Sequence, residues 1–102
     1  MNLRWSLRAR RDLVEIGAPI AQEDPDAARR WVERLCKRAR TAVSQPYGGR
    51  RVPELGRDEI REVFPGRTYR IVYRVDGDDI HVLTVFQGHR LSTRDSAPDG
   101  QS

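Results

Sequence analysis

The residues best suited to chemistry lie in the stretch Glu59–Arg90, where arginines and histidines interrupt short apolar runs. Within it, the segment Tyr69–Val75 alternates with period two, which places Arg70 and Arg74 on one face of a strand and the tyrosines on the other. A guanidinium forms paired hydrogen bonds with carboxylates and phosphates. The pattern therefore predicts a sheet face that meets an anion or a protein partner.

Each of these cations also has a plain structural interpretation. Arg61, Arg70 and Arg74 could instead pair with acidic residues on neighbouring strands. The candidate acids are Glu59, Glu62 and Asp79. We favour a contact role for Arg70, whereas both interpretations stay open for Arg61 and Arg74. His89 is the candidate proton-transfer group, but a single histidine at a strand end is more often only polar, and we expect no catalysis there.

A second group of cations recurs at helical spacing and comprises Arg30, Arg34, Lys37 and Arg38. Such a face is usually solvated, but it could also bind an acidic segment of a partner. The charge distribution supports the second possibility: residues 1–57 hold thirteen basic and seven acidic side chains (+6), against six and eight in residues 58–102 (−2). Eighteen of the nineteen basic residues are arginine, a bias that phosphate or carboxylate recognition and GC-rich codon usage explain equally well.

The elements that must position these side chains follow from periodicity and from turn residues. Asn2–Trp5 reads as a short edge strand, and Ser6 as the N-cap of a helix that extends from Leu7 to about Glu23. Pro19 should kink or interrupt that helix. Asp24 and Pro25 begin a second helix, which ends before Gln45-Pro46-Tyr47-Gly48-Gly49. The expected strands that follow are Arg50–Val52, Glu59–Phe64, Thr68–Val75 and Ile80–Gln87.

This order predicts an α+β fold, in which an N-terminal β-strand and an antiparallel helical hairpin pack on a C-terminal antiparallel β-meander. With 102 residues and 37% hydrophobic content, the chain has room for one modest core. We expect a single domain over residues 1–90 and a loose tail over 91–102. Trp5, Trp31, Tyr69 and Tyr73 are candidate core residues.

Several classes of protein are disfavoured by the composition. Cys36 is the only cysteine, which excludes an internal disulfide and a thiolate metal cluster. The N-terminus lacks the apolar core of a secretory signal, and no apolar run approaches the roughly 20 residues of a membrane-spanning helix. We therefore expect a cytoplasmic protein that uses no cofactor or metal and does not associate with membranes.

The chain resembles the RelE/ParE superfamily, the toxins of bacterial type II toxin–antitoxin systems, from about Trp5 to Arg90. The matching pieces, in order, are Ala9-x-x-Asp12-Leu13-x-x-Ile16, Pro25-x-Ala27-Ala28, Pro46, Gly49-Arg50-x-Val52-Pro53-Glu54, Ile60-Arg61-Glu62 and Tyr69-Arg70-Ile71-Val72-Tyr73-Arg74-Val75. The resemblance implies the small α+β fold of that superfamily. It also implies a cognate antitoxin as partner, in a hetero-oligomeric complex.

The superfamily has two activities, and the resemblance leaves both open. RelE-like toxins are ribosome-dependent endonucleases that cut mRNA in the A site. Carried over to this chain, Arg61, Arg70 and Arg90 would stabilise the phosphate charge and His89 would transfer protons. However, Glu59 and Ser96 fall near positions where such toxins have lysine and tyrosine. The nuclease set is thus incomplete.

ParE-like toxins share the fold but poison DNA gyrase without being nucleases. Arg61-Glu62, the Tyr69–Val75 strand and Gly88-His89-Arg90 resemble this branch, which we favour. No catalytic residue is then expected, and the chain would act through the surface it presents. The expected contacts with antitoxin or target are Arg30, Arg34, Lys37, Arg38, Arg61, Arg70, Arg74 and Arg90. A member that has lost toxicity and acts only as a binding module is a third possibility.

Overall fold

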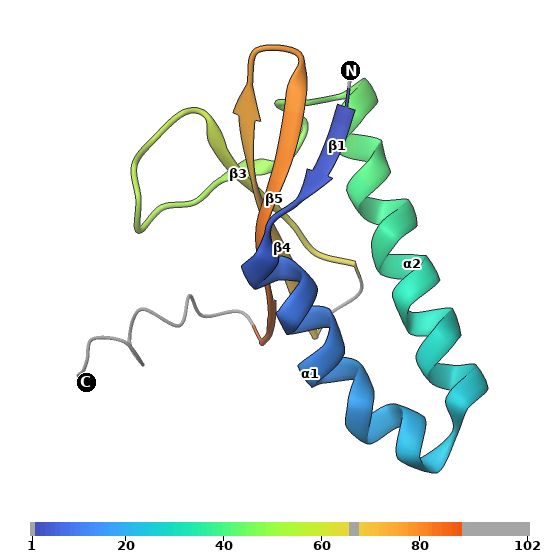
Figure 1. Cartoon of the computed structure of the whole chain (residues 1–102). Helices are drawn as coiled ribbons and strands as arrows, with labels where there is room; N and C mark the ends of the chain where they lie inside the picture. Colours follow the sequence, from blue (N-terminus) through green and yellow to red (C-terminus); the bar gives the residue numbers. More distant parts are fainter. Residues whose placement is uncertain (1, 66–67, 89–102) are drawn as a thin grey trace.

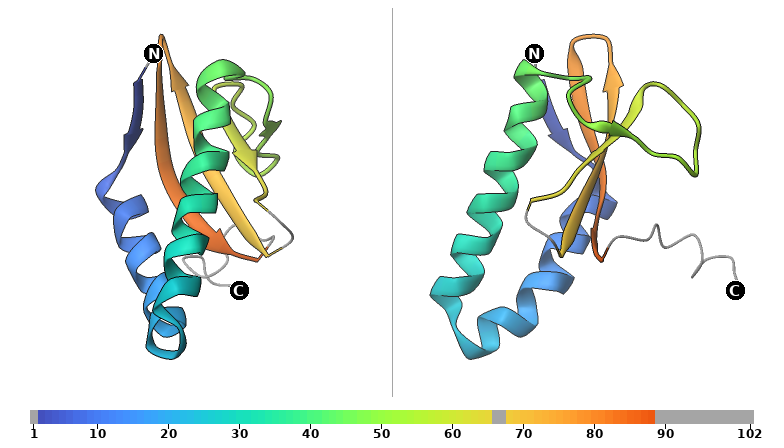
Figure 2. Two further views of the ribbon diagram at one scale, coloured as in Figure 1. Left: turned by 90° about the vertical axis from the view of Figure 1, so that its right-hand side faces the viewer. Right: turned by 180° about the vertical axis from the view of Figure 1, so that it is seen from behind.

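Two helices lie against one face of a five-stranded sheet in a computed structural model that describes residues 2–65 and 68–88 (Figures 1 and 2). The elements are β1 (Asn2–Trp5), α1 (Leu7–Glu23), α2 (Pro25–Ser44), β2 (Arg50–Arg51), β3 (Ile60–Val63), β4 (Tyr69–Asp76) and β5 (Asp79–Gln87). The predicted α+β order and the helical hairpin are confirmed. The expectations for His89, Arg90 and the tail over 91–102 lie outside the described residues.

The sheet has the order β1-β5-β4-β3-β2, so that the last four strands in sequence form the predicted antiparallel meander. β1 adds to the other edge of β5 in parallel orientation. The connection between β2 and β3 projects away from the helices (Figure 1). It helps to enclose a small apolar cluster of Val52, Ile60 and Val72.

The main core lies between the helices and the sheet. β4 contributes Ile71, Tyr73 and Val75, and α2 contributes Trp31 and Leu35. The predicted alternation of β4 is confirmed, because its odd-numbered residues face the helices. Trp31 and Tyr69 meet edge to face, with ring centroids 5.1 Å apart, and Trp5 packs against the same core. The prediction that the tryptophans and Tyr69 and Tyr73 serve packing is thus confirmed.

α1 is fixed to β5 by two side chains at its beginning. The Ser6 hydroxyl accepts a hydrogen bond from the Ala9 amide and donates one to the Leu83 carbonyl, both at 2.9 Å. One turn later, Asp12 accepts hydrogen bonds from the Thr84 hydroxyl (2.6 Å) and the Val85 amide (3.0 Å). These contacts begin where the pairing of β1 with β5 ends, so α1 satisfies polar groups on the edge that β1 leaves uncovered.

The register of β5 shifts beside this attachment. Val72 pairs with Thr84 but Tyr73 pairs with Val82, so Leu83 is an extra residue in β5. A bulge of this kind bends the strand and leaves local backbone groups without ladder partners. The Ser6 hydroxyl satisfies the Leu83 carbonyl, which joins the bulge to the beginning of α1.

Of the two effects predicted for Pro19, interruption of the first helix is wrong, since α1 continues to Glu23, and a kink stays a prediction. Proline removes the amide that would bond the carbonyl four residues earlier. Both Pro19 and Glu15 lie on the exposed side of α1, where water can replace that bond. The predicted start of the second helix is confirmed: the Asp24 carboxylate accepts hydrogen bonds from the amides of Asp26 and Ala27.

Candidate protein-binding site

Arg70, which we expected on a contact surface, is buried on the sheet face opposite the helices. Its side chain is 1% exposed and forms an ion pair with Glu62, whose side chain is 0% exposed. Glu54 lies 3.5 Å from the same guanidinium. The prediction of a surface contact at Arg70 is therefore wrong. A buried guanidinium without an acid would be strongly disfavoured, and β3 supplies that acid from the neighbouring strand.

Glu62 also positions a cation that the sequence did not single out. Its second carboxylate oxygen lies 2.7 Å from Nε and 2.6 Å from Nη2 of Arg50, whose side chain is 61% exposed. The guanidinium carbon of Arg50 lies 5.7 Å from the ring centroid of Phe64. Arg50 could have been identified only from the register of β2 on β3, in which Arg50 lies opposite Glu62. Sequence periodicity does not contain that register for a two-residue strand.

Arg61 points to the other face of the sheet. It pairs with Tyr73, which belongs to the helix-facing core, and opposed residues of neighbouring strands share a face. Its side chain, 14% exposed, forms an ion pair with Asp58 (2.7 Å), donates to the Gly49 carbonyl and lies over the Tyr47 ring. Arg61 and Arg70 therefore cannot combine their charges at one reacting phosphate.

Arg74 lies near the end of β4 opposite Ile60 and His81. Its guanidinium is 3.8 Å from Asp76, which also lies 3.6 Å from the His81 imidazole. This is a loose, exposed cluster of the kind that screening makes weak. Among the described residues, the acid within ion-pair distance of Arg74 is Asp76 of the same strand, and not one of the predicted cross-strand partners Glu59, Glu62 and Asp79.

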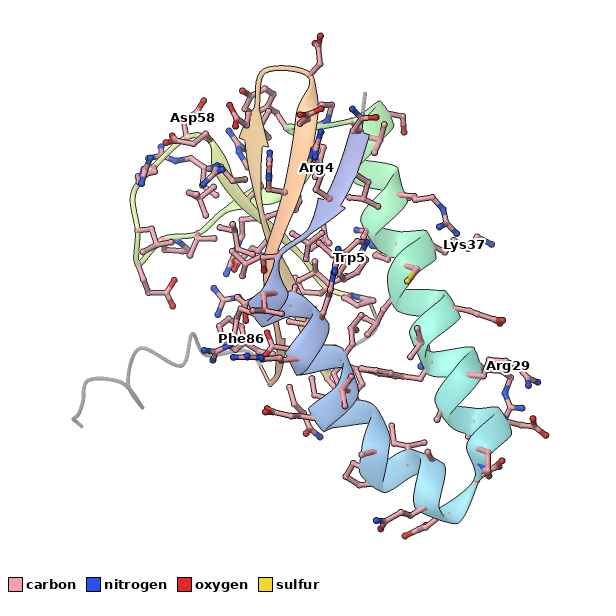
Figure 3. The ribbon with its side chains drawn as sticks, viewed as in Figure 1. Arg4, Trp5, Arg29, Lys37, Asp58 and Phe86 are labelled. Carbon is pink, nitrogen blue, oxygen red and sulfur yellow. The ribbon has the colours of Figure 1, made fainter. Side chains whose placement is uncertain are left out.

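The predicted basic face of α2 is present on the surface. Arg30, Arg34 and Lys37 are exposed, and Arg38 is half-buried with its Nη1 donating to the Thr41 hydroxyl at 2.8 Å. Figure 3 shows Lys37 and Arg29 projecting from α2 away from the sheet. The structure thus brings four of the predicted contact residues together on one helix.

A groove of about 330 Å³ separates this basic face from the end of β3. Its lining residues are Arg34, Lys37, Arg38, Thr41, Phe64 and Pro65. One wall is therefore cationic and the other apolar. We call this site the α2–β3 groove. Sequence reasoning found the cations but not Phe64 or Pro65, because their position beside α2 depends on how the helix crosses the sheet.

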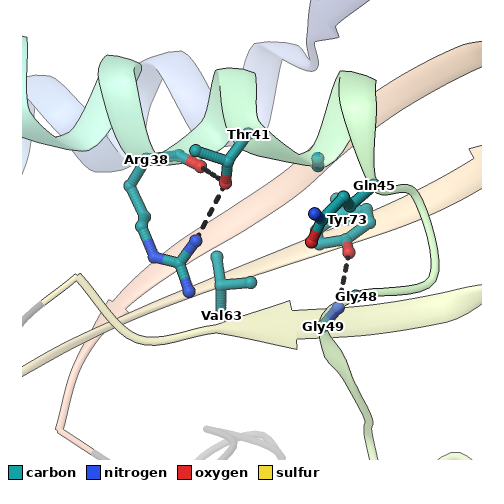
Figure 4. A pocket seen from close by; sticks show the side chains of 8 residues that line it. Arg38, Thr41, Gln45, Gly48, Gly49, Val63 and Tyr73 are labelled. Atoms are coloured by element: carbon teal, nitrogen blue, oxygen red, sulfur yellow. Dashed lines mark hydrogen bonds between the residues drawn. The ribbon is translucent and has the colours of Figure 1, made fainter.

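A smaller polar pocket of about 100 Å³ lies beside the groove (Figure 4). Arg38 and Thr41 line it from α2, and Tyr73 from β4. The Tyr73 hydroxyl donates to the Pro46 carbonyl (2.8 Å) and accepts from the Gly49 amide (3.3 Å). Burial raises the pKa of Tyr73 above its usual value of 10.0. This tyrosine therefore stays protonated at neutral pH and joins the end of α2 to the sheet.

Residues 2–65 and 68–88 contain neither a candidate metal cluster nor a membrane-spanning helix. No group of three or more histidine, cysteine, aspartate or glutamate side chains is placed there to hold a metal ion. No helix in these ranges is long and apolar enough to cross a membrane. Cys36, the free thiol, is half-buried on α2.

A helical hairpin on one face of a mixed sheet, with a cation-lined groove between helix and sheet, defines a small α+β protein with a candidate protein-binding surface. The chain belongs to the ParE toxin family. The family model described as "ParE toxin of type II toxin-antitoxin system, parDE" matches residues 3–91.

Known proteins agree with this membership. The chain is 39% identical over 89 residues to the Sinorhizobium fredii protein named "Putative toxin Y4kP", covering 87% of this chain and 90% of that protein. Its fold matches a chain of the "Chromosomal ParDE TA system from P. aeruginosa" with a TM-score of 0.71 at 20% identity, over 87% and 97% of the two chains. The "YoeB/ParE toxin from Agrobacterium tumefaciens" matches with a TM-score of 0.61 at 23% identity, over 88% and 100%.

Proposed function

We propose that this chain is the toxin of a type II toxin–antitoxin pair, that it inhibits growth by poisoning DNA gyrase, and that a cognate antitoxin neutralises it. Membership of the ParE family supports the toxin assignment. The solved "Chromosomal ParDE TA system from P. aeruginosa" supports a partner protein for this chain. Action on gyrase would take place in the cytoplasm.

We favour gyrase over ribosome-bound mRNA as the target because Arg61 and Arg70 lie on opposite faces of the sheet. RNA cleavage by 2′-hydroxyl attack needs cations gathered around one phosphate, together with proton donors and acceptors. Arg70 is already neutralised by Glu62, and Arg61 by Asp58. This arrangement favours action through surface contacts over a nuclease mechanism.

The proposed contacts are accordingly the cations that remain accessible. Arg30, Arg34, Lys37 and Arg38 form the basic face of α2, and Arg74 lies at the end of β4. Arg90 is retained as a proposed contact, although it lies outside the described residues. We assign no catalytic residue.

The test separates the two targets in one strain. The chain is induced in bacteria without its partner, and plasmid supercoiling, DNA breakage and mRNA cleavage are measured together. The proposal expects lost supercoiling or broken DNA, intact mRNA in the ribosomal A site, and rescue of growth by the product of the neighbouring gene. Purified chain should inhibit supercoiling by purified gyrase.

Cleavage of mRNA in the A site that His89→Ala abolishes would overturn the gyrase proposal in favour of the RelE-like nuclease. A chain that accumulates in folded form without slowing growth would instead indicate a binding module that has lost toxicity. The Arg70→Ala variant is unsuitable for this test, because removal of a buried ion-pair partner would destabilise the fold and could lower activity without any role in catalysis.

A further inference from the structure

We propose that the α2–β3 groove binds a short acidic segment of the antitoxin, with an apolar side chain of that segment seated on Phe64 and acidic side chains meeting Arg34 and Lys37. The inference rests on the proposed function, since it takes the partner to be the antitoxin. It adds the location of the site and the chemistry of the segment that occupies it.

The first argument is the excess of like charge on α2 between residues 30 and 38, where Glu33 is the one acid among four cations. Arg30, Arg34 and Arg38 follow one another at spacings of four residues, and Lys37 lies three residues after Arg34. Like charges at these spacings destabilise a helix. Within residues 2–65 and 68–88, neither Arg34 nor Lys37 lies within ion-pair distance of an acidic side chain. An acidic partner would relieve this repulsion.

The second argument is the composition of the groove. Phe64 and Pro65 form an apolar wall that faces the cationic wall of α2. No acidic residue is among the described residues that line it. Apolar contact supplies affinity through burial, whereas surrounding charge supplies selectivity and speeds association. A segment that combines apolar and acidic side chains matches both walls.

The third argument distinguishes a peptide from a nucleic acid. Single-stranded nucleic acids bind by stacking bases on aromatic rings and by placing phosphates on cations. The Arg50 guanidinium already lies over the Phe64 ring, where the buried carboxylate of Glu62 holds it. Stacking of a base on that side would displace a fixed cation. One face of the ring is therefore closed to base stacking, and the choice of a peptide rests on the matched apolar and cationic walls of the groove.

The experiment uses the full chain and the protein encoded beside its gene, with affinity measured by calorimetry or by competition. Phe64→Ala removes the apolar wall and should weaken binding by about tenfold or more. The double variant Arg34→Glu/Lys37→Glu reverses the cationic wall and should weaken binding at least as much, mainly through slower association. Added salt should weaken binding by the wild-type chain and have a smaller effect on the double variant.

Arg40→Glu is the control for charge reversal on α2, because it reverses one charge, where the double variant reverses two, at an exposed position that does not line the groove. It should keep most of the wild-type affinity. Phe64 is half-buried, so Phe64→Ala could weaken binding by disturbing the fold. Arg34 and Lys37 are exposed, so the double variant tests the groove with less risk to the fold. Circular dichroism checks that both variants are folded.

The outcomes separate the two proposals. A wild-type complex that the groove variants do not weaken, or that Arg40→Glu weakens equally, overturns the groove and leaves the toxin–antitoxin proposal in place. Failure of the wild-type chain to bind its neighbour overturns both. If the groove variants weaken binding of a fluorescent single-stranded RNA oligonucleotide but not of the neighbouring protein, the groove is a nucleic-acid site and the peptide assignment is wrong.

Discussion

Glu62 lies between Arg50 and Arg70, and each of its carboxylate oxygens binds one of the two guanidinium groups. Arg70 is buried with it, whereas the Arg50 side chain extends to the surface over Phe64. One buried carboxylate therefore neutralises an interior cation and orients an exterior one. The interior of the sheet and the edge of the α2–β3 groove are joined through this single side chain.

Loss of the Glu62 charge should strongly destabilise the chain. Glu62→Gln keeps the shape of the side chain but leaves Arg70 without its main counter-charge, which should lower the free energy of unfolding by about 3–5 kcal/mol. Urea denaturation measures the change. Asp58→Asn is the control, because the Asp58 carboxylate that pairs with Arg61 is exposed. Loss of this pair should lower the free energy of unfolding by no more than about 1 kcal/mol. Equal effects of the two substitutions would contradict this account.

Asp12→Ala should loosen α1 from β5. The substitution removes the acceptor of the Thr84 hydroxyl and leaves the Val85 amide without its partner, at a cost of about 1–3 kcal/mol. Hydrogen exchange at the Val85 amide should accelerate together with the loss of stability. Glu15→Ala, on the exposed side of the same helix, should change neither quantity. Unchanged exchange at Val85 in Asp12→Ala would show that Asp12 does not hold α1 to β5.

Tyr73 should make the chain sensitive to alkaline pH. Burial raises its pKa above 10.0 in the folded state, so the folded tyrosine stays protonated while the unfolded one ionises. Stability from this group is complete below pH 10 and is lost as the pH rises through the folded pKa. Urea denaturation at several pH values checks the sign. Tyr73→Phe should be less stable at neutral pH by about 1 kcal/mol and should lose this part of the alkaline decline.

Gly49 and Gly17 should respond oppositely to alanine. A Cβ at Gly49 would lie 2.7 Å from both the Glu62 carbonyl oxygen and the Tyr73 hydroxyl, so Gly49→Ala should cost about 1–3 kcal/mol. At Gly17 the nearest atom is 3.6 Å away on the Trp31 ring, an ordinary contact. Gly17→Ala should therefore stabilise α1 by up to about 1 kcal/mol. Thermal unfolding of the two variants measures both effects. A Gly49→Ala variant more stable than the wild-type chain would contradict the close packing around Gly49.

Much of the fold could be predicted because its signals are local. The Ser6 and Asp24 caps, the periodicity of α2 and the alternation of Tyr69–Val75 each involve residues close in sequence. Interruption of α1 at Pro19 was predicted wrongly, since the cost of a missing helical hydrogen bond depends on whether water can replace it. The parallel pairing of β1 with β5 was not predicted, because residues 2–5 and 79–82 are distant in the chain.

The candidate site was predictable only in part, as the arginines illustrate. Arg34 and Lys37 were placed correctly on an exposed helical face, because helix period alone decides which residues share that face. Arg70 was predicted as a contact residue because strand alternation assigns a face without saying what covers it. The segment between β2 and β3 folds over that face and encloses Val52, Ile60 and Val72.

The sequence by itself therefore determined the elements, their order and the supply of cations on α2. Only the tertiary structure decided which cations are accessible, since strand register places Arg61 and Arg70 on opposite faces and sets Glu62 against Arg70. It also brought Phe64 and Pro65 beside α2 to form the groove. Register and packing depend on contacts between distant segments, and their energies are not contained in any local pattern of residues.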